Sequence, residues 1–204
     1  RLLPPGQKCR RIMVRDRVRA AREPRIPPSP MSDRSPDGRT PTLGTPLRVV
    51  SASSLDGLLP HAAAWNALCV EAPQRMPTLS HAWASAWLET RVEPQETWRC
   101  HFAYEGDRLV GVLPVVRRAR GWLAGFELAP PRDHHTRSGD VLLAPGHARA
   151  TFTALLDAAF RADGHPYRLA LSGVRAGSPT LDVLAERSPR GALFRRPDER
   201  GSYV

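Results

Sequence analysis

The spacing of apolar and polar positions predicts a β-hairpin in the middle of the chain. Residues 97–104, TWRCHFAY, alternate with a period of two, and a second apolar run follows at 108–116. Only Glu105 and the pair Gly106-Asp107 separate the runs, and such a pair is typical of a tight turn between antiparallel strands. Because Pro114 lacks an N–H group, it predicts an edge or a bulge near the end of the second strand.

Further short apolar runs, bounded by Gly, Pro and polar residues, predict more strands on both sides of this hairpin. These runs lie at residues 47–52, 121–130, 140–145, 167–173 and 191–196.

Apolar residues at helical spacing predict helices between these strands. Two helices should precede the hairpin: Leu55 to Ala72, capped by Ser54, and 81–92, capped by Ser80. Pro60 should mark the first turn of the former or a kink in it. Two more helices are predicted at 147–162 and from Ser178-Pro179 to about Arg187.

Trp83 and Trp87 lie four residues apart and therefore on the same face of the second predicted helix. We expect both indole rings to belong to the core, since large aromatic side chains at helical spacing are usually buried. The alternative is an exposed shelf on which a flat ligand stacks.

The first 46 residues differ from the rest in composition. They contain nine prolines and no sustained apolar period, which predicts a leader without regular structure ahead of a folded domain over 47–204. Residues 1–48 carry 12 basic and 4 acidic side chains, against 18 and 16 in the remainder, so most of the net charge of +10 belongs to the leader. Because the leader lacks interleaved aromatic residues, we do not expect nucleic acid to be its partner.

The cysteines indicate neither a disulfide framework nor a structural zinc site. Cys9, Cys69 and Cys100 are odd in number and widely spaced, and no CxxC pair occurs. We interpret Cys69 and Cys100 as buried free thiols, which suits a reducing cytoplasm. The sequence contains no run of 18 apolar residues, so no membrane span is predicted.

The predicted order β-α-α-β-β-β-β-α-β-α-β indicates an α+β fold, with helices packed on a mixed, mostly antiparallel central sheet. Within this order, the segments SHAWASAWLETRV (80–92), FAYEGDRLVGVLPVVRR (102–118) and DVLL (140–143), with a polar Asp-His loop before the last, resemble the CelD-type acyltransferases. These belong with the Fem aminoacyltransferases to the two-half GNAT-like proteins. The resemblance covers about residues 47–200 and implies the first of the two halves, truncated at its C-terminus.

The resemblance implies transfer of an acyl group from acetyl-CoA to an amine. GNAT-like proteins hold the diphosphate of coenzyme A on backbone N–H groups after a Gln/Arg-x-x-Gly-x-Gly/Ala loop. The two segments of this chain that precede the later predicted helices each contain a single glycine, Gly146 in VLLAPGHAR and Gly177 in RAGSP, so neither matches that loop. We therefore expect acetyl-CoA to be bound mainly by residues after Val204. The acceptor implied is a small molecule or an amine related to the cell envelope or to polysaccharides.

The candidate substrate-binding residues gather in one polar segment. They are Asp133, His134, His135, Arg137 and Asp140. A histidine beside a carboxylate can act as a general base toward an amine, but a solvent-exposed loop with capping aspartates is the alternative. Adjacent histidines on an extended chain point in opposite directions, so no metal site is predicted. His101 and His147 are interpreted as structural.

Two further hypotheses remain beside the acyltransferase. One is a non-catalytic GNAT-like module that binds a polar ligand or a partner protein. The other, less favoured, is a nucleic-acid binder with a basic tail. The sequence contains no Walker A, GxGxxG or GxSxG motif that would point to a different enzyme class.

Overall fold

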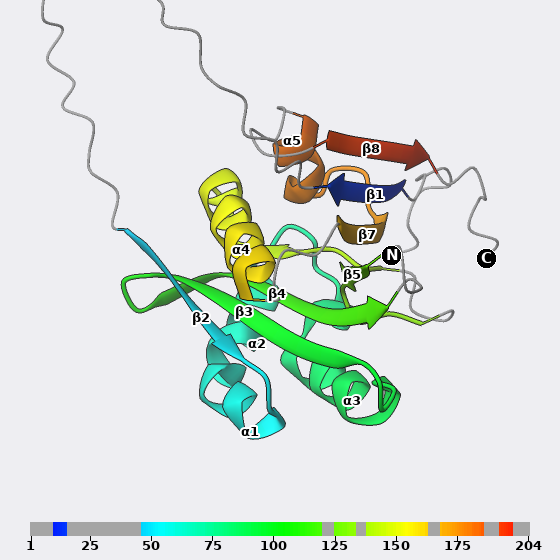
Figure 1. Ribbon diagram of the computed structural model, residues 1–204. Coiled ribbons are helices and arrows are strands. Elements are labelled where there is room, and N and C mark those ends of the chain that lie inside the picture. Colours follow the sequence, from blue (N-terminus) through cyan, green and yellow to red (C-terminus); the bar gives the residue numbers. More distant parts are fainter. Residues whose placement is uncertain are drawn as a thin grey trace, which may run out of the picture.

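The predicted hairpin forms two neighbouring strands, next to the edge strand β2, of a β-sheet in the computed structural model (Figure 1). Strand β3 (Thr97–Glu105) pairs antiparallel with β4 (Arg108–Ala119), and Gly106 in the turn has φ of 59°. Glycine suits this left-handed backbone conformation because it has no Cβ. The structure describes residues 10–15, 46–119, 125–133, 138–162, 168–185 and 192–197, with side chains for 46–119, 125–133, 138–162 and 168–184.

Around the hairpin the sheet runs in the order β2-β3-β4-β5-β7-β1-β8, and β6 pairs with part of β4. The pairs are antiparallel except β5 with β7, which are parallel. The fold is therefore α+β with a mostly antiparallel sheet, as the sequence predicted. The other strands are β1 (Arg10–Arg15), β2 (Leu47–Ala52), β5 (Phe126–Ala129), β6 (Leu142–Leu143), β7 (Arg168–Val174) and β8 (Ala192–Pro197).

Helices cover both faces of the central strands (Figure 1). On one face, Phe102 of β3 contacts Trp65, with ring centroids 5.6 Å apart. On the other, a helix packs directly on Gly111 of β4, where a Cβ atom would lie 2.3 Å from Cγ2 of Thr151. The helices are α1 (Leu55–Leu58), α2 (Ala62–Glu71), α3 (His81–Arg91), α4 (Ala148–Ala162) and α5 (Pro179–Ala185), with 3₁₀ turns η1 (Leu59–His61) and η2 (Pro77–Leu79).

The predicted helix caps are confirmed. The Ser54 hydroxyl accepts from the Gly57 N–H at 3.2 Å, and the Ser80 hydroxyl accepts from the Trp83 N–H at 3.3 Å. Each bond satisfies a backbone donor that has no partner within the first turn. The segment from Leu55 to Ala72 is not one helix, however, because the chain tightens into η1 around Pro60.

The expectation of an edge or a bulge at Pro114 is wrong. Pro114 lies opposite Cys100 in the regular register of a strand inside the sheet, and the irregularity of this pair falls at Ala103/Tyr104 instead. On its other side, β4 pairs with β6 at Gly111 and Val112 and with β5 from Val116 onward. Pro114 therefore lies between two short partners, where its missing N–H interrupts neither ladder.

The structure differs from the sequence prediction in the N-terminal segment and in the length of one strand. Residues 10–15 form β1 between β7 and β8, although the sequence predicted no regular structure before Leu47. The prediction missed this strand because RRIMVR is short, basic and followed by Pro-rich sequence. Of the strand predicted at 121–130, β5 covers Phe126–Ala129, and residues 121–124 lie outside the described part of the chain.

Candidate functional site

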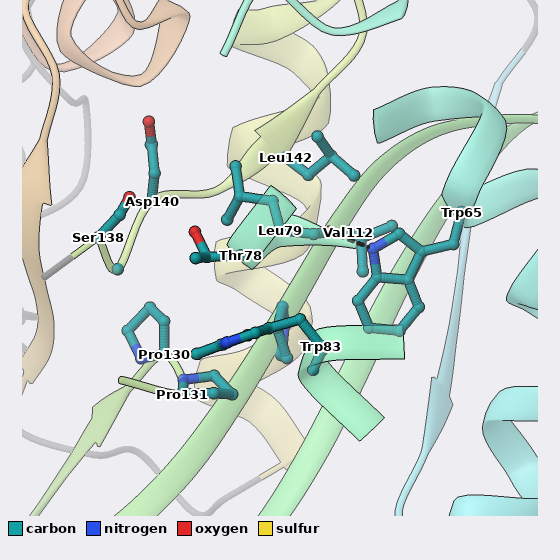
Figure 2. A pocket seen from close by; sticks show the side chains of 13 residues that line it. Trp65, Thr78, Leu79, Trp83, Val112, Pro130, Pro131, Ser138, Asp140 and Leu142 are labelled. Atoms are coloured by element: carbon teal, nitrogen blue, oxygen red, sulfur yellow. Dashed lines mark hydrogen bonds between the residues drawn. The ribbon is translucent and has the colours of Figure 1, made fainter. Parts of the chain in front are cut away.

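Two pockets on the α2–α3 side of the sheet meet at Asp140, in the segment that leads into β6. The tryptophan pocket lies between α3, β4 and the residues that follow β5 (Figure 2). The Gln74 pocket lies between the α2–η2 connection and the turn from β7 to α5. Asp140 is the one residue of the predicted cluster that lines either pocket within the described parts of the chain.

The tryptophan pocket has apolar walls and little free space. Trp65 is held in place because its Nε1–H donates to the Leu79 carbonyl at 2.7 Å. The ring of Trp83 lies beside Pro130 and Pro131 in Figure 2. The free space is only about 10 Å³, which is room for about one water molecule. A larger ligand would require Trp83 to move.

The two tryptophans of α3 have different environments. Trp87 is buried at 6 % exposure, which confirms its predicted place in the core, and its Nε1–H has no partner among the described residues. Trp83 is only partly buried and contributes both to the edge of the core and to the pocket wall. The alternative of a stacking shelf therefore concerns Trp83 alone.

Asp140 is buried at 1 % exposure and is hydrogen-bonded through both carboxylate oxygens. Its Oδ1 accepts from the Val141 N–H at 2.7 Å, and its Oδ2 accepts from the Ser178 hydroxyl at 2.6 Å. Burial raises the pKa of the Asp140 carboxyl, while hydrogen bonds from Ser178, Thr180 and Val141 act in the opposite direction. Asp140 thus joins the start of β6 to α5 and places a carboxyl group between the two pockets.

The backbone next to Asp140 is attached to β7. The Gly139 N–H donates to the Ser172 carbonyl at 2.6 Å, in an isolated antiparallel bridge. The bond fixes the backbone immediately before Asp140, so the position of its side chain is set from two directions.

The Gln74 pocket contains more polar groups and more space, about 140 Å³. Gln74 is 6 % exposed, and its Nε2 donates to the Val141 carbonyl at 2.8 Å, whereas its Oε1 has no partner in the described parts of the chain. Met76 lines the same pocket, and its Sδ accepts from the Ser138 hydroxyl at 3.2 Å. The half-buried Arg175 also lines this pocket and has no ion-pair partner among the described side chains.

The remaining predicted site residues are not brought into these pockets by the described structure. His134, His135 and Arg137 lie outside the described residues, so a general base among them stays a prediction. Asp133 is partly exposed and already has an interaction partner. Among the described residues, no group of three or more His, Cys, Asp and Glu side chains is placed to hold a metal ion.

The interpretation of His101 as structural is consistent with its surroundings. It is fully buried on β3, and its Nδ1 lies 2.8 Å from the Ser51 hydroxyl of β2. Burial, helped by the nearby positive charge of Arg99, lowers the pKa of His101 to about 4. The imidazole is therefore neutral at physiological pH.

The N-terminus of α4 carries a negatively charged neighbour. Gly146, before the helix, has φ of 79°, and Nδ1 of the following His147 lies 3.6 Å from Oε2 of Glu105. Helix N-termini attract anions through their free N–H groups and the helix dipole. A carboxylate already present at this end opposes the binding of a second, more highly charged anion.

Gln74 and Arg175 were missed by the sequence analysis. Gln74 lies in APQRMPT, which reads as a helix-breaking loop, and Arg175 follows a strand at a turn. Nothing in the local pattern indicates that these loops meet. The available signal was weak: a polar residue in a short connection between two apolar helices.

No helix in the described parts of the chain has both the length and the apolar character required to cross a bilayer. Neither a family model nor a curated protein matches the sequence closely enough to be counted as a relative.

Proposed function

We propose that residues 47–204 are the N-terminal part of a GNAT-like N-acyltransferase, which transfers an acyl group from acyl-CoA to an amine. The observation that carries the proposal is the order of the sheet. A first strand, β2, is followed by helices α1 to α3, by the antiparallel strands β3, β4 and β5, and then by α4 and β7, which is parallel to β5. Apart from the parallel pair, this is the order of strands and helices predicted from the sequence, within which the GNAT-like resemblance lies.

The two pockets around Asp140 support a role on the acceptor side of the reaction. The lining of one pocket contains the buried Asp140 carboxyl group and Gln74, whose Oε1 has no donor among the described residues, and both favour a ligand that carries N–H donors, as amines do. In the proposed reaction the amine nitrogen attacks the thioester carbonyl carbon, the C–S bond breaks, and the thiolate of coenzyme A leaves and takes up the proton lost by the amine. Because both Asp140 oxygens already accept hydrogen bonds, we assign this residue a positioning role.

The donor acetyl-CoA is proposed to be bound mainly by residues after Val204. The α4 N-terminus lacks the glycine pattern, and the Glu105 carboxylate next to His147 opposes the binding of a diphosphate there. We expect residues 1–204 alone to show no micromolar affinity for acetyl-CoA in a calorimetric titration. A micromolar dissociation constant would contradict this division of the site.

The transfer itself is tested with a chain that continues past Val204 in the same reading frame. Release of coenzyme A from acetyl-CoA is followed with a thiol reagent in the presence of a panel of amines, and acylated products are identified by mass spectrometry. Amine-dependent release supports the proposal. If that longer chain releases no coenzyme A with any amine, and also binds no acetyl-CoA, the alternative of a non-catalytic GNAT-like binding module replaces it.

A further inference from the structure

The lining of the Gln74 pocket includes both hydrogen-bond acceptors and a cationic side chain. Gln74 comes from the α2–η2 connection, Arg175 from the turn that follows β7, and Asp140 from the segment that leads into β6. These three side chains are far apart in sequence and meet only through the fold. The free space, about 140 Å³, suits a molecule with a few non-hydrogen atoms.

The orientation of Gln74 is fixed by the hydrogen bond that it makes to Val141, directly before β6. Its Nε2 donates to the Val141 carbonyl at 2.8 Å, so the amide cannot rotate without losing this bond. The carbonyl end, Oε1, is buried and has no donor among the described residues. A buried carbonyl without a donor is costly, and a ligand N–H group in the pocket would remove that cost.

Asp140 adds a buried carboxyl group to the lining of the same pocket. It is buried at 1 % exposure, and its two hydrogen bonds to Val141 and Ser178 hold the carboxylate in a fixed position. Burial raises the pKa of this carboxyl group, and a cationic group bound beside it would favour its ionised form. A protonated amine is therefore a better ligand for this group than a neutral hydroxyl group.

Arg175 adds a cationic side chain to the pocket lining, which favours a carboxylate group on the ligand. Arg175 lines the same pocket as Gln74 and Asp140, and it forms no ion pair with the described side chains. Guanidinium binds carboxylates through two parallel hydrogen bonds, which fixes orientation as well as charge. A ligand that satisfies both preferences must carry an ammonium group and a carboxylate a short distance apart.

We propose that the Gln74 pocket binds a free amino acid with a small side chain, with its ammonium group toward Gln74 and Asp140 and its carboxylate on Arg175. This inference rests on the proposed function only in naming the amino acid as the acceptor of the acyl group. The binding itself needs no acyl donor and is tested separately.

The first experiment compares three probes on the chain of residues 1–204: L-alanine, ethylamine and propionate. Binding is measured by saturation-transfer NMR and by calorimetry. Ethylamine lacks the carboxylate and propionate lacks the amine, so each probe removes one of the two contacts. We expect L-alanine to bind at least tenfold more tightly than either fragment. Equal affinities for the three probes, or no binding of L-alanine at millimolar concentration, overturn the proposal.

Variants then locate the binding. Arg175→Gln is expected to weaken L-alanine binding at least tenfold and to leave ethylamine binding unchanged. Arg91→Gln removes the same charge from an exposed position at the end of α3 and serves as the matched control, with no change expected. Gln74→Met should weaken both L-alanine and ethylamine, and its melting temperature is recorded because the bond to Val141 is lost as well. If Arg175→Gln and Arg91→Gln bind L-alanine equally, the assignment of the carboxylate to Arg175 is wrong.

The two proposals fail in different ways. If L-alanine binds as expected but the longer chain never acylates an amine, the pocket assignment holds and the acyltransferase proposal is lost. If the longer chain acylates amines, but L-alanine neither binds to residues 1–204 at millimolar concentration nor is acylated by the longer chain, the enzyme proposal holds and the amino-acid pocket is rejected.

Discussion

Glu127 of β5 accepts a hydrogen bond from Nε of Arg168 on β7, across the parallel pair of the described sheet. The two side chains are 2 % and 14 % exposed, respectively. Among the described residues, the parallel pairing of β5 with β7 comprises only two residue pairs, Glu127↔Arg168 and Leu128↔Leu169. This ion pair therefore lies at the narrow junction that connects the hairpin side of the sheet to the strands that follow α4.

We expect Arg168→Met to lower the free energy of unfolding by about 3–5 kcal/mol, because it leaves the Glu127 carboxylate buried without this partner. Urea denaturation of the purified chain measures the change. The double replacement Glu127→Leu with Arg168→Met should recover most of the loss, since neither charge then remains buried. A double variant whose loss equals the sum of the two single losses would refute this explanation.

The contact between Gly111 and Thr151 predicts a size limit at position 111. A Cβ atom there would meet Thr151 Cγ2 at 2.3 Å and Leu155 Cδ1 at 3.0 Å. We expect Gly111→Ala to reduce stability by about 1–3 kcal/mol through overpacking between α4 and β4. Thr151→Ser deletes the Cγ2 atom, so the double variant should regain at least half of the loss. Thermal unfolding checks this, and absence of any recovery would show that the helix does not pack as closely as described.

His101 predicts a loss of stability in acid. Its pKa is about 4 in the folded chain against 6.5 for an ordinary histidine, so between these values the unfolded state binds a proton that the folded state does not. The contribution of the neutral His101 to the free energy of unfolding is therefore fully present above pH 6.5, and it is lost as the pH decreases toward 4. The loss amounts to about 3 kcal/mol at 1.36 kcal/mol for each pH unit.

The measurement compares denaturant unfolding at pH 7.5 and pH 4.5 in the wild type and in His101→Gln. Burial also lowers the pKa values of His61 and His81. These two groups contribute the same pH dependence of the unfolding free energy to the wild type and to the variant. Their contribution cancels in the difference, which isolates His101. An identical pH dependence in the two proteins would show that His101 is not the neutral buried group described.

The two tryptophans of α3 should respond differently to truncation. Trp87→Ala removes a buried core side chain and is expected to cost about 3–5 kcal/mol. Trp83→Ala should cost clearly less because the ring is only partly buried, and it should open the tryptophan pocket. Thermal melting measures both. Equal losses from both substitutions would place Trp83 in the core with Trp87.

The sequence predicted those parts of the fold that depend on local pattern. The hairpin followed from the alternation of Trp98, Cys100 and Phe102, and the helix starts followed from Ser54 and Ser80. The fold class was confirmed because these elements occur in the predicted order. Pro114 was misjudged because its tolerance depends on where β5 and β6 end, which is tertiary information.

The candidate site was predicted only in part. Asp140 was named from a polar segment, and the structure places it beside two pockets. Gln74 and Arg175 were not named, since their shared pocket exists only because the α2–η2 connection meets the end of β7. Proximity of this kind carries no periodic signal along the chain. The acyltransferase assignment depends on resemblance and topology and remains a proposal.

The burial of the β3–β4 hairpin on both faces has a consequence for how the protein forms. Its strands join residues that are near neighbours along the chain across the Gly106 turn, so closing this loop costs little conformational entropy. Contacts between sequence neighbours also form fastest during folding. The hairpin is thus the natural early template onto which α2 and α4 condense, and its backbone amides should be among the last to exchange with deuterium.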